Sequence, residues 1–295
     1  MKRTKQPIRK PTAILTGDWH LREDQPVCRT DDYWETQRKK TEFISELQEK
    51  YQCPIFHSGD LFNHWKPSPH LLSMFIAHFS QNLSFYICFG NHDLPQHSIN
   101  LAEKSGLWTL RIADWISIRQ THWEQEPDEE SLFLPESDRN VLIWHVMTWT
   151  GERPWPGCED PIAEEILDRY PQFDLILTGH NHKTFVVERN GRLLVNPGSM
   201  MRMAADQENH EPCAFLWYAE TNEIERVVLP HEKGVVSREH IEAHEGQDDS
   251  RYQAFIRGLQ EDTPQISFRA NLEEFFRQQN TGKKVKEIVW ESVED

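Results

Sequence analysis

Short apolar runs alternate with amphipathic stretches along the first two thirds of the chain. The apolar runs have the length of buried strands, whereas one longer stretch places Phe43, Ile44 and Leu47 on a single helical face. Strands that alternate with helices predict an α/β sandwich with a largely buried sheet. The predicted strands span 12–18, 54–60, 83–90, 141–147 and 173–179, and the predicted helices span 32–51, 70–79 and roughly 161–170.

The pattern changes after Gly179. Residues 184–196 predict a hairpin that turns at Asn190-Gly191, and 214–229 predict another. From about residue 232 the composition becomes polar, as in a linker. Helical patterns follow at 252–260 and 271–279, and 283–290 fit a strand or a helix. We therefore predict a main domain over 1–232 and a small C-terminal α/β appendage over 233–295.

Composition narrows the class of protein. The longest apolar runs have five or six residues, so no membrane helix is expected. The N-terminus is basic but too polar beyond Leu15 for a signal peptide. Five widely spaced cysteines without a C-x-x-C pair indicate reduced thiols in a cytoplasmic protein.

The net charge is −16, which argues against nucleic-acid binding through a general basic surface. The charge is unevenly spread, because residues 206–295 hold 20 acidic and 10 basic side chains. The acidity therefore lies mostly in the tail, away from the residues considered next.

Each of the five predicted strands ends in side chains of metal-binding type. In an open α/β sheet, ligands bind beyond the carboxyl ends of the strands, so residues far apart in sequence converge there. One such cluster alone is more often a turn or a packed histidine, but five in one chain favour a shared site. The clusters are Gly17-Asp18-Trp19-His20, Gly59-Asp60, Gly90-Asn91-His92-Asp93, Trp144-His145 and Gly179-His180-Asn181-His182.

The donor set has a chemical meaning. Asp-x-His and His-x-His in extended backbone direct both side chains to one side, and an adjacent glycine permits a sharp turn and close approach. Carboxylate, amide and imidazole together suit Mn²⁺, Fe²⁺ or Zn²⁺, whereas the lack of thiolates argues against a structural zinc or iron–sulfur site.

The order D-x-H, G-D, G-N-H-D, H, G-H-x-H resembles the calcineurin-like metallophosphoesterase superfamily over roughly Ile14 to Met203. The resemblance implies a four-layer αββα sandwich and a phosphoester hydrolase with two divalent ions. Mn²⁺ is favoured, with Fe²⁺, Mg²⁺ or Zn²⁺ as alternatives. It assigns Asp18, His20 and His182 to the first ion, Asn91, His145 and His180 to the second, and Asp60 to both.

The same resemblance gives His92 a role that is not ligation. His92 would face the scissile phosphate and assist the leaving group, and Asp93 would orient His92. Two ions about 3.5–4 Å apart can clamp a phosphate and activate a water near neutral pH, and a protonated imidazole can help the departing alkoxide.

Three stretches resemble SbcD-type DNA-repair exonucleases more narrowly: Thr16–Leu21, Gly59–Leu72 and Asn196–Met203. This predicts a DNA nuclease of repair or recombination, an SbcC-like ATPase partner and a homodimer. The chain departs from that family in being short and in having an acidic tail, which fits a small phage-type relative better than a processive duplex nuclease.

Several features have two interpretations. Trp144, Trp149 and Trp155 could stack on bases but are more often core or loop-packing residues, by about two to one. Arg153 and Arg202 could bind substrate phosphate or form surface ion pairs. Residues 268–279 could dock a partner or pack on their own core.

Two alternatives to DNA hydrolysis stay open. One is a phosphodiesterase or phosphatase acting on small-molecule nucleotides or phosphoproteins. The other is a non-catalytic scaffold with the same fold, which the complete ligand set and His92 disfavour.

Overall fold

The computed structural model describes residues 9–122, 125–127, 132–134, 138–239, 276–277, 282–283 and 285–286. The chain divides into two compact units, Met1–Arg238 and Glu239–Asp295. The first unit runs past the predicted boundary at residue 232, because the segment after it pairs with an early loop. Ser237 N–H donates to Cys28 O at 2.7 Å, and Thr30 N–H donates to Val235 O at 3.1 Å.

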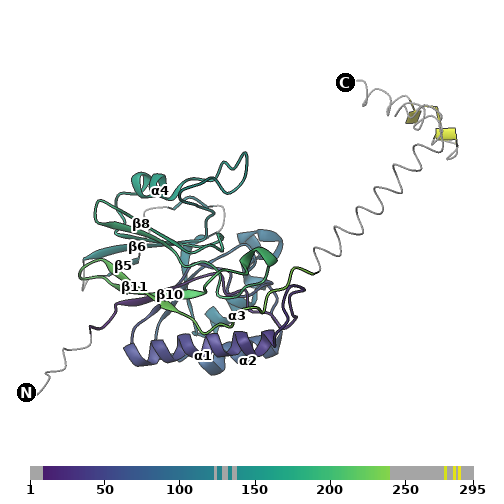
Figure 1. Ribbon diagram of the computed structural model, residues 1–295. Coiled ribbons are helices and arrows are strands. Elements are labelled where there is room, and N and C mark those ends of the chain that lie inside the picture. Colours follow the sequence, from purple (N-terminus) through teal and green to yellow (C-terminus); the bar gives the residue numbers. More distant parts are fainter. Residues whose placement is uncertain are drawn as a thin grey trace, which may run out of the picture. The chain divides into compact units, whose positions relative to one another are not determined.

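Two sheets form the centre of the first unit (Figure 1). The six-stranded sheet has the order β11-β10-β1-β2-β3-β4, in which β1 to β4 are parallel and β10 and β11 form an antiparallel hairpin at the edge. Its strands are β1 (Ala13–Thr16), β2 (Ile55–His57), β3 (Phe85–Phe89), β4 (Ser117–His122), β10 (Cys213–Tyr218) and β11 (Glu223–Val228).

The five-stranded sheet has the order β5-β6-β7-β9-β8. Its central strands β6, β7 and β9 are parallel, and β5 and β8 pair antiparallel at the two edges. The strands are β5 (Leu132–Leu134), β6 (Arg139–Trp144), β7 (Leu175–Thr178), β8 (Phe185–Arg189) and β9 (Arg192–Asn196).

Helices cover the outer faces of both sheets. Asp32 caps α1 (Tyr33–Tyr51) by accepting from Glu35 N–H, and Ser68 caps α2 (Pro69–His78) by accepting from Leu71 N–H. In the described part of the first unit, the other α-helices are α3 (Gly106–Ile112) and α4 (Ala163–Arg169), and short 3₁₀ helices lie at Pro95–His97, Ile99–Lys104 and Ala205–Gln207.

Alternation along the strands separates three apolar cores. In β1, Ile14 packs towards α1 and α2, whereas Ala13 and Leu15 face the second sheet. In β6, Ile143 faces the first sheet and Leu142 packs towards α4. This period of two follows from the pleat. Three cores between four layers make an αββα sandwich, as expected, with α1 and α2 on one side and α4 on the other (Figure 1).

Most predicted elements of the first unit are present. Most are shorter than predicted, but α2 begins one residue before the predicted 70 and β6 begins two residues before the predicted 141. The pattern missed α3, β4 and β5. The C-terminal predictions at 252–260, 271–279 and 283–290 lie largely outside the described residues, although Lys283, Val285 and Lys286 are helical. All five cysteines are buried and free. Among the described residues, no helix combines the length and apolar character that spanning a membrane requires.

Candidate metal centre

The carboxyl ends of β1, β2, β3, β6 and β7 meet at one place and bring the polar clusters together. The loops after β1 and β2 run side by side, since Asp18 N–H donates to Gly59 O at 3.1 Å and His20 N–H to Asp60 O at 3.0 Å. From the second sheet, His180 N–H donates to Asp18 Oδ1 at 3.0 Å. Backbone hydrogen bonds therefore fix the positions from which the side chains project.

Four of the candidate ligands adopt left-handed backbone conformations. Their φ angles are 50° at Asp18, 46° at His20, 55° at Asp60 and 71° at His180. Such conformations are uncommon for residues with a Cβ and cluster at functional sites. The sequence pattern predicts that the neighbouring glycines form the sharp turns. In the structure, the ligand residues themselves adopt most of the left-handed conformations.

Gly90 is needed for close approach. A Cβ at this position would lie 2.1 Å from Asp60 Oδ1 and 2.5 Å from Asp60 N, which is sterically excluded. The loop after β3 can therefore pack directly on Asp60 only because residue 90 has no side chain.

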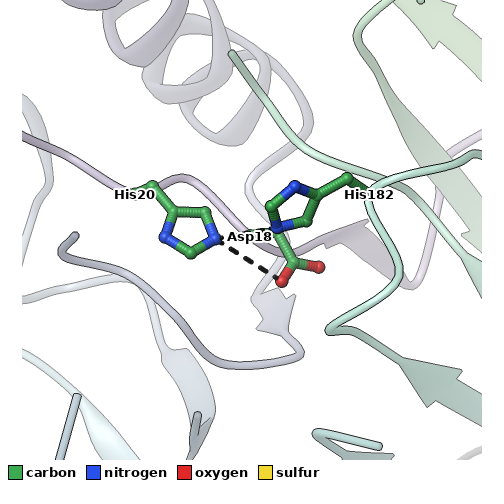
Figure 2. Close-up of side chains that lie close together, drawn as sticks. All are labelled: Asp18, His20 and His182. Atoms are coloured by element: carbon green, nitrogen blue, oxygen red, sulfur yellow. Dashed lines mark hydrogen bonds and ion pairs between the residues drawn. The ribbon is translucent and has the colours of Figure 1, made fainter. Parts of the chain in front are cut away.

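The first cluster joins Asp18, His20 and His182, whose ligand atoms lie within 4.8 Å of one another. The two Nε2 atoms of His20 and His182 are 3.1 Å apart, and His20 Nε2 lies 3.9 Å from Asp18 Oδ1 (Figure 2). Asp18 Oδ2 is buried and has no hydrogen-bond partner among the residues that the structure describes. A buried orphan carboxylate oxygen beside two facing imidazole nitrogens fits a shared cation.

The second cluster joins Asp60, His145 and His180, again within 4.8 Å. Asn91 Oδ1 lies 3.1 Å from both His145 Nε2 and His180 Nδ1, so the amide oxygen faces the same point. His145 Nδ1 lies 2.7 Å from Ser58 O, the geometry of a donated N–H. This contact leaves Nε2 directed at the cluster, as in histidines that ligate metals.

Asp60 connects the two clusters through one oxygen. Its Oδ2 lies 3.6 Å from His20 Nε2 and 3.4 Å from His145 Nε2. Its Oδ1 accepts the His92 N–H at 2.8 Å. One carboxylate oxygen is thus held by the backbone, and the other stands between the two groups of ligands.

The charges at the site are strongly coupled. Burial alone would raise the pKa of Asp60, but His145 and His20 hold it well below its usual range. Burial, partly offset by His145 and reinforced by Asp60, raises the pKa of Asp18 to about 7. Burial and the nearby His145 lower the pKa of His180 to about 4. Burial alone would lower the pKa of His145, but Asp60 raises it to about 9, so its proton is held by the carboxylates. Carboxylates and imidazoles buried at such close range are the donor types that a divalent cation takes.

His92 is half-buried beside the first cluster. Its ring is edge-on to the His20 ring, with centroids 4.7 Å apart. Its Nδ1 lies 2.8 Å from Asn63 O, so the Nδ1–H donates there and Nε2 stays available. His92 also forms a group with His20 and Asp60 whose ligand atoms lie within 4.8 Å, so geometry permits ligation as well as proton transfer.

Asp93 does not have the contacts that the expected orienting role requires. Its carboxylate accepts from the backbone N–H groups of Asp60 at 2.7 Å and Gly90 at 3.0 Å. The group that holds the His92 ring is the Asn63 carbonyl. Because Asp93 is buried among these amides, its role in the structure is to tie the loop after β3 to the loop after β2.

The two arginines expected to bind substrate lie elsewhere. Arg202 is only 3% exposed and donates to the carbonyls of Glu208 and Glu232, so it is a buried structural residue. Arg153 is exposed in the loop before α4 and lines neither cavity described below. Sequence reasoning missed Ser58 and Asn63, which act through backbone carbonyls and therefore leave no side-chain signal.

The family model of the calcineurin-like phosphoesterase superfamily domain matches residues 14–220. The chain therefore belongs to the calcineurin-like phosphoesterase superfamily, and the mixed α/β sandwich and the clustered Asp and His side chains agree with this membership. Members use paired divalent metals, and the clusters described here fit that use. None of the curated proteins matches the chain.

Two of the solved structures that match the chain have low sequence identity to it. An archaeal phosphodiesterase has 16% identity and a TM-score of 0.42, over 74% of this chain and 99% of that one. Zinc-complexed Vps29 from Entamoeba histolytica has 13% identity and a TM-score of 0.36, over 73% of this chain and 98% of that one. Neither likeness carries an argument about substrate.

Proposed function

We propose that this superfamily member is a dinuclear-metal phosphodiesterase that hydrolyses DNA. The observation that carries the metal chemistry is the position of Asp60 Oδ2, 3.6 Å from His20 Nε2 and 3.4 Å from His145 Nε2. Each imidazole belongs to a different ligand group, so one oxygen can serve both. When bound, two divalent ions would polarise the phosphate and supply an activated water. We infer Mn²⁺ as the working metal.

The chain's own residues supply the remaining steps. Asp18, His20 and His182 would hold one ion, and Asn91, His145 and His180 the other. His92 keeps its Nδ1–H on Asn63 O, so its Nε2–H is the proton available to the departing alkoxide. The backbone bond from His92 N–H to Asp60 Oδ1 keeps that imidazole at the centre.

The three stretches that resemble SbcD-type exonucleases support DNA as the substrate, since they contact one another at the centre. Met200 N–H donates to Asp18 O at 3.1 Å, and His20 N–H donates to Asp60 O at 3.0 Å. The resemblance is therefore concentrated in the residues that build the site. An SbcC-like ATPase partner, a homodimer and a cytoplasmic location stay predictions.

A small-molecule nucleotide is the second candidate, and the cavity beside the centre favours it. This cavity has a volume of about 790 Å³ and includes the acidic side chains of Glu126, Asp160 and Asp206 in its wall. Acidic walls repel the paired phosphates of a duplex more than they repel one phosphodiester.

Cleavage of end-labelled linear duplex and single-stranded DNA with Mn²⁺ tests the proposal, against EDTA and Asp60→Asn controls. Metal-dependent cleavage that Asp60→Asn abolishes would support it, and the product ladder would give the polarity. Hydrolysis of a generic diester and of nucleotides, without DNA cleavage, would overturn DNA as the substrate and favour the second candidate.

A further inference from the structure

The cavity beside the metal centre continues beyond the ligands. This cavity has a volume of about 790 Å³, and His145, His180 and His182 form part of its wall. A second cavity of about 430 Å³ adjoins it. The two share Met147, Trp155, Asn181, Lys183 and Asp206, so these residues stand at the junction of the two hollows.

Trp155 is exposed at this junction, so it is not a core-packing residue. Its side chain is 47% exposed, and no other tryptophan in the described ranges is exposed. By contrast, Trp144 is 5% exposed and packs with Tyr170 and Phe173 in the core beneath α4. A large apolar surface left open beside a catalytic centre is a candidate contact for ligand.

The loop that carries Trp155 is built to hold the indole in place. Pro154 and Pro156 flank it, which fixes the neighbouring φ angles and restricts Trp155 to extended backbone. At the base of the loop, Trp149 Nε1 donates to Asp160 O at 2.9 Å and Ala163 N–H donates to Trp149 O at 2.8 Å. A stiff, anchored loop lowers the entropy lost when the indole binds a partner.

The charges at the junction select the kind of partner. Lys183 is exposed and has no ion-pair partner within the described part of the chain, whereas Arg169 in the same wall pairs with Glu126 at 3.4 Å. One available cation among acidic side chains suits the spaced phosphates of one strand. It does not suit the dense charge of a duplex.

We propose that Trp155 stacks on an unpaired base next to the scissile phosphate of a single-stranded DNA end, with Lys183 beside a neighbouring phosphate. The proposal rests on the proposed function. Stacking needs a base that is free of its partner, and aromatic side chains bind such bases without reading sequence. The second cavity gives room for the strand to continue past Trp155, which a mononucleotide would not need.

Trp155→Ala and Trp155→Phe test the stacking when two substrates are compared with Mn²⁺. One substrate is a single-stranded oligonucleotide, and the other is an abasic strand of the same length, which has the phosphates but no aromatic ring. Stacking contributes roughly 1–3 kcal/mol per base, so kcat/KM of Trp155→Ala on the oligonucleotide should fall about 5- to 150-fold, mainly through KM. Trp155→Phe should retain most of the wild-type kcat/KM on the oligonucleotide, and neither variant should change hydrolysis of the abasic strand.

Ile112→Ala is the matched control, because Ile112 is an apolar side chain, 70% exposed, that lines neither cavity. Unchanged oligonucleotide turnover in Trp155→Ala would overturn the stacking, with the hydrolytic function intact. An equal loss on both substrates would also overturn it, since Trp155 would then support the site itself.

A wild-type protein that hydrolyses no diester would remove the proposed function but would still leave a test of the stacking. Fluorescence anisotropy of a labelled single strand measures binding without turnover. Weaker binding by Trp155→Ala, with Ile112→Ala like wild type, would support the stacking, and equal binding by all three would refute it. A stronger dependence on Trp155 for duplex than for single strand would contradict the choice of an unpaired base.

Discussion

Lys40 Nζ donates to Met200 O at 2.7 Å, and this bond joins α1 to the segment that follows β9. Lys40 is 1% exposed, which is rare for a lysine. Met200 N–H in turn donates to Asp18 O at 3.1 Å, and Ser199 N–H donates to His182 O at 3.1 Å. A buried lysine on a surface helix therefore braces the segment that holds two candidate ligands from different sheets.

Several side chains besides Lys40 donate hydrogen bonds to this segment. Every carbonyl from Ser199 to Met203 accepts a hydrogen bond from a side chain. Buried carbonyls outside helices and strands need hydrogen-bond partners, and in this segment side chains supply them. The donors are His210, Lys40, Ser199, Arg29 and Cys28, in the order of the carbonyls.

Lys40→Met should change the pH dependence of stability. Burial, with Arg29 and Arg202 nearby, lowers the pKa of Lys40 to about 7 from 10.5. Between these values the unfolded chain binds a proton that the folded chain does not, so this lysine makes stability rise with pH. Below about pH 7, Lys40 is charged in both states, and the full cost of burying that charge lowers the stability of the folded protein. Above about pH 10.5, Lys40 is neutral in both states, and this cost is gone. One proton gives at most about 1.4 kcal/mol per pH unit.

Urea unfolding of wild type and Lys40→Met at pH 7, 8 and 9 measures this difference. The wild-type free energy of unfolding should rise relative to the variant over that range. Lys39→Met, which replaces an exposed lysine on the same helix, is the control and should run parallel to wild type. Parallel curves for all three proteins would show that Lys40 is charged in the folded state at pH 9.

Asp60→Asn should abolish turnover and weaken metal binding without unfolding the protein. Asparagine tolerates the left-handed backbone at this position, where φ is 55°. Its amide oxygen can accept the His92 N–H, which leaves the NH₂ group facing His20 and His145, where a cation would be. Metal content by elemental analysis and diester hydrolysis measure the effect.

Asp114→Asn is the matched control for that variant. Asp114 is an exposed aspartate with a φ of 60°, close to the φ of Asp60. The same substitution is therefore made in the same left-handed backbone conformation, but outside the site. Normal activity there and none in Asp60→Asn would assign the loss to the charge. Two ions retained by an active Asp60→Asn would refute the bridging role.

His92→Ala should lower the rate by roughly 10²–10⁴ while two metal ions remain bound. A proton donor matters most for a poor leaving group, so an alkyl diester should lose more rate than a p-nitrophenyl diester. His64→Ala, at an exposed histidine nearby, should resemble wild type. If His92→Ala lost one metal ion, His92 would be a metal ligand together with His20 and Asp60, and not a proton donor.

Gly90→Ala should disrupt the centre although it adds one methyl group. The new Cβ would meet Asp60 Oδ1 at 2.1 Å and Asp60 N at 2.5 Å, and both belong to a fully buried residue. Thermal unfolding should occur at lower temperature, and metal content should fall. Gly282→Ala is the control, because its Cβ would meet no atom within 4 Å. Wild-type metal binding in Gly90→Ala would show that the loop after β3 can retreat from Asp60.

The sequence by itself determined the layered fold and the place of the site. Apolar runs such as 83–90 have the period and length of buried strands, and polar residues that directly follow parallel strands must converge at one edge. Local pattern was weaker for β4 and β5, edge strands whose pairing depends on partners distant in sequence.

Only the tertiary structure decided the contacts within the site. Asp93 bonds to the backbone of Asp60 instead of the His92 ring, and Arg202 lies buried against carbonyls, because both positions depend on loops from other strands. A backbone carbonyl such as Asn63 O is the same chemical group at every residue, so its role cannot be read from sequence. The exposure of Trp155 likewise follows from where its loop lies, which periodicity does not encode.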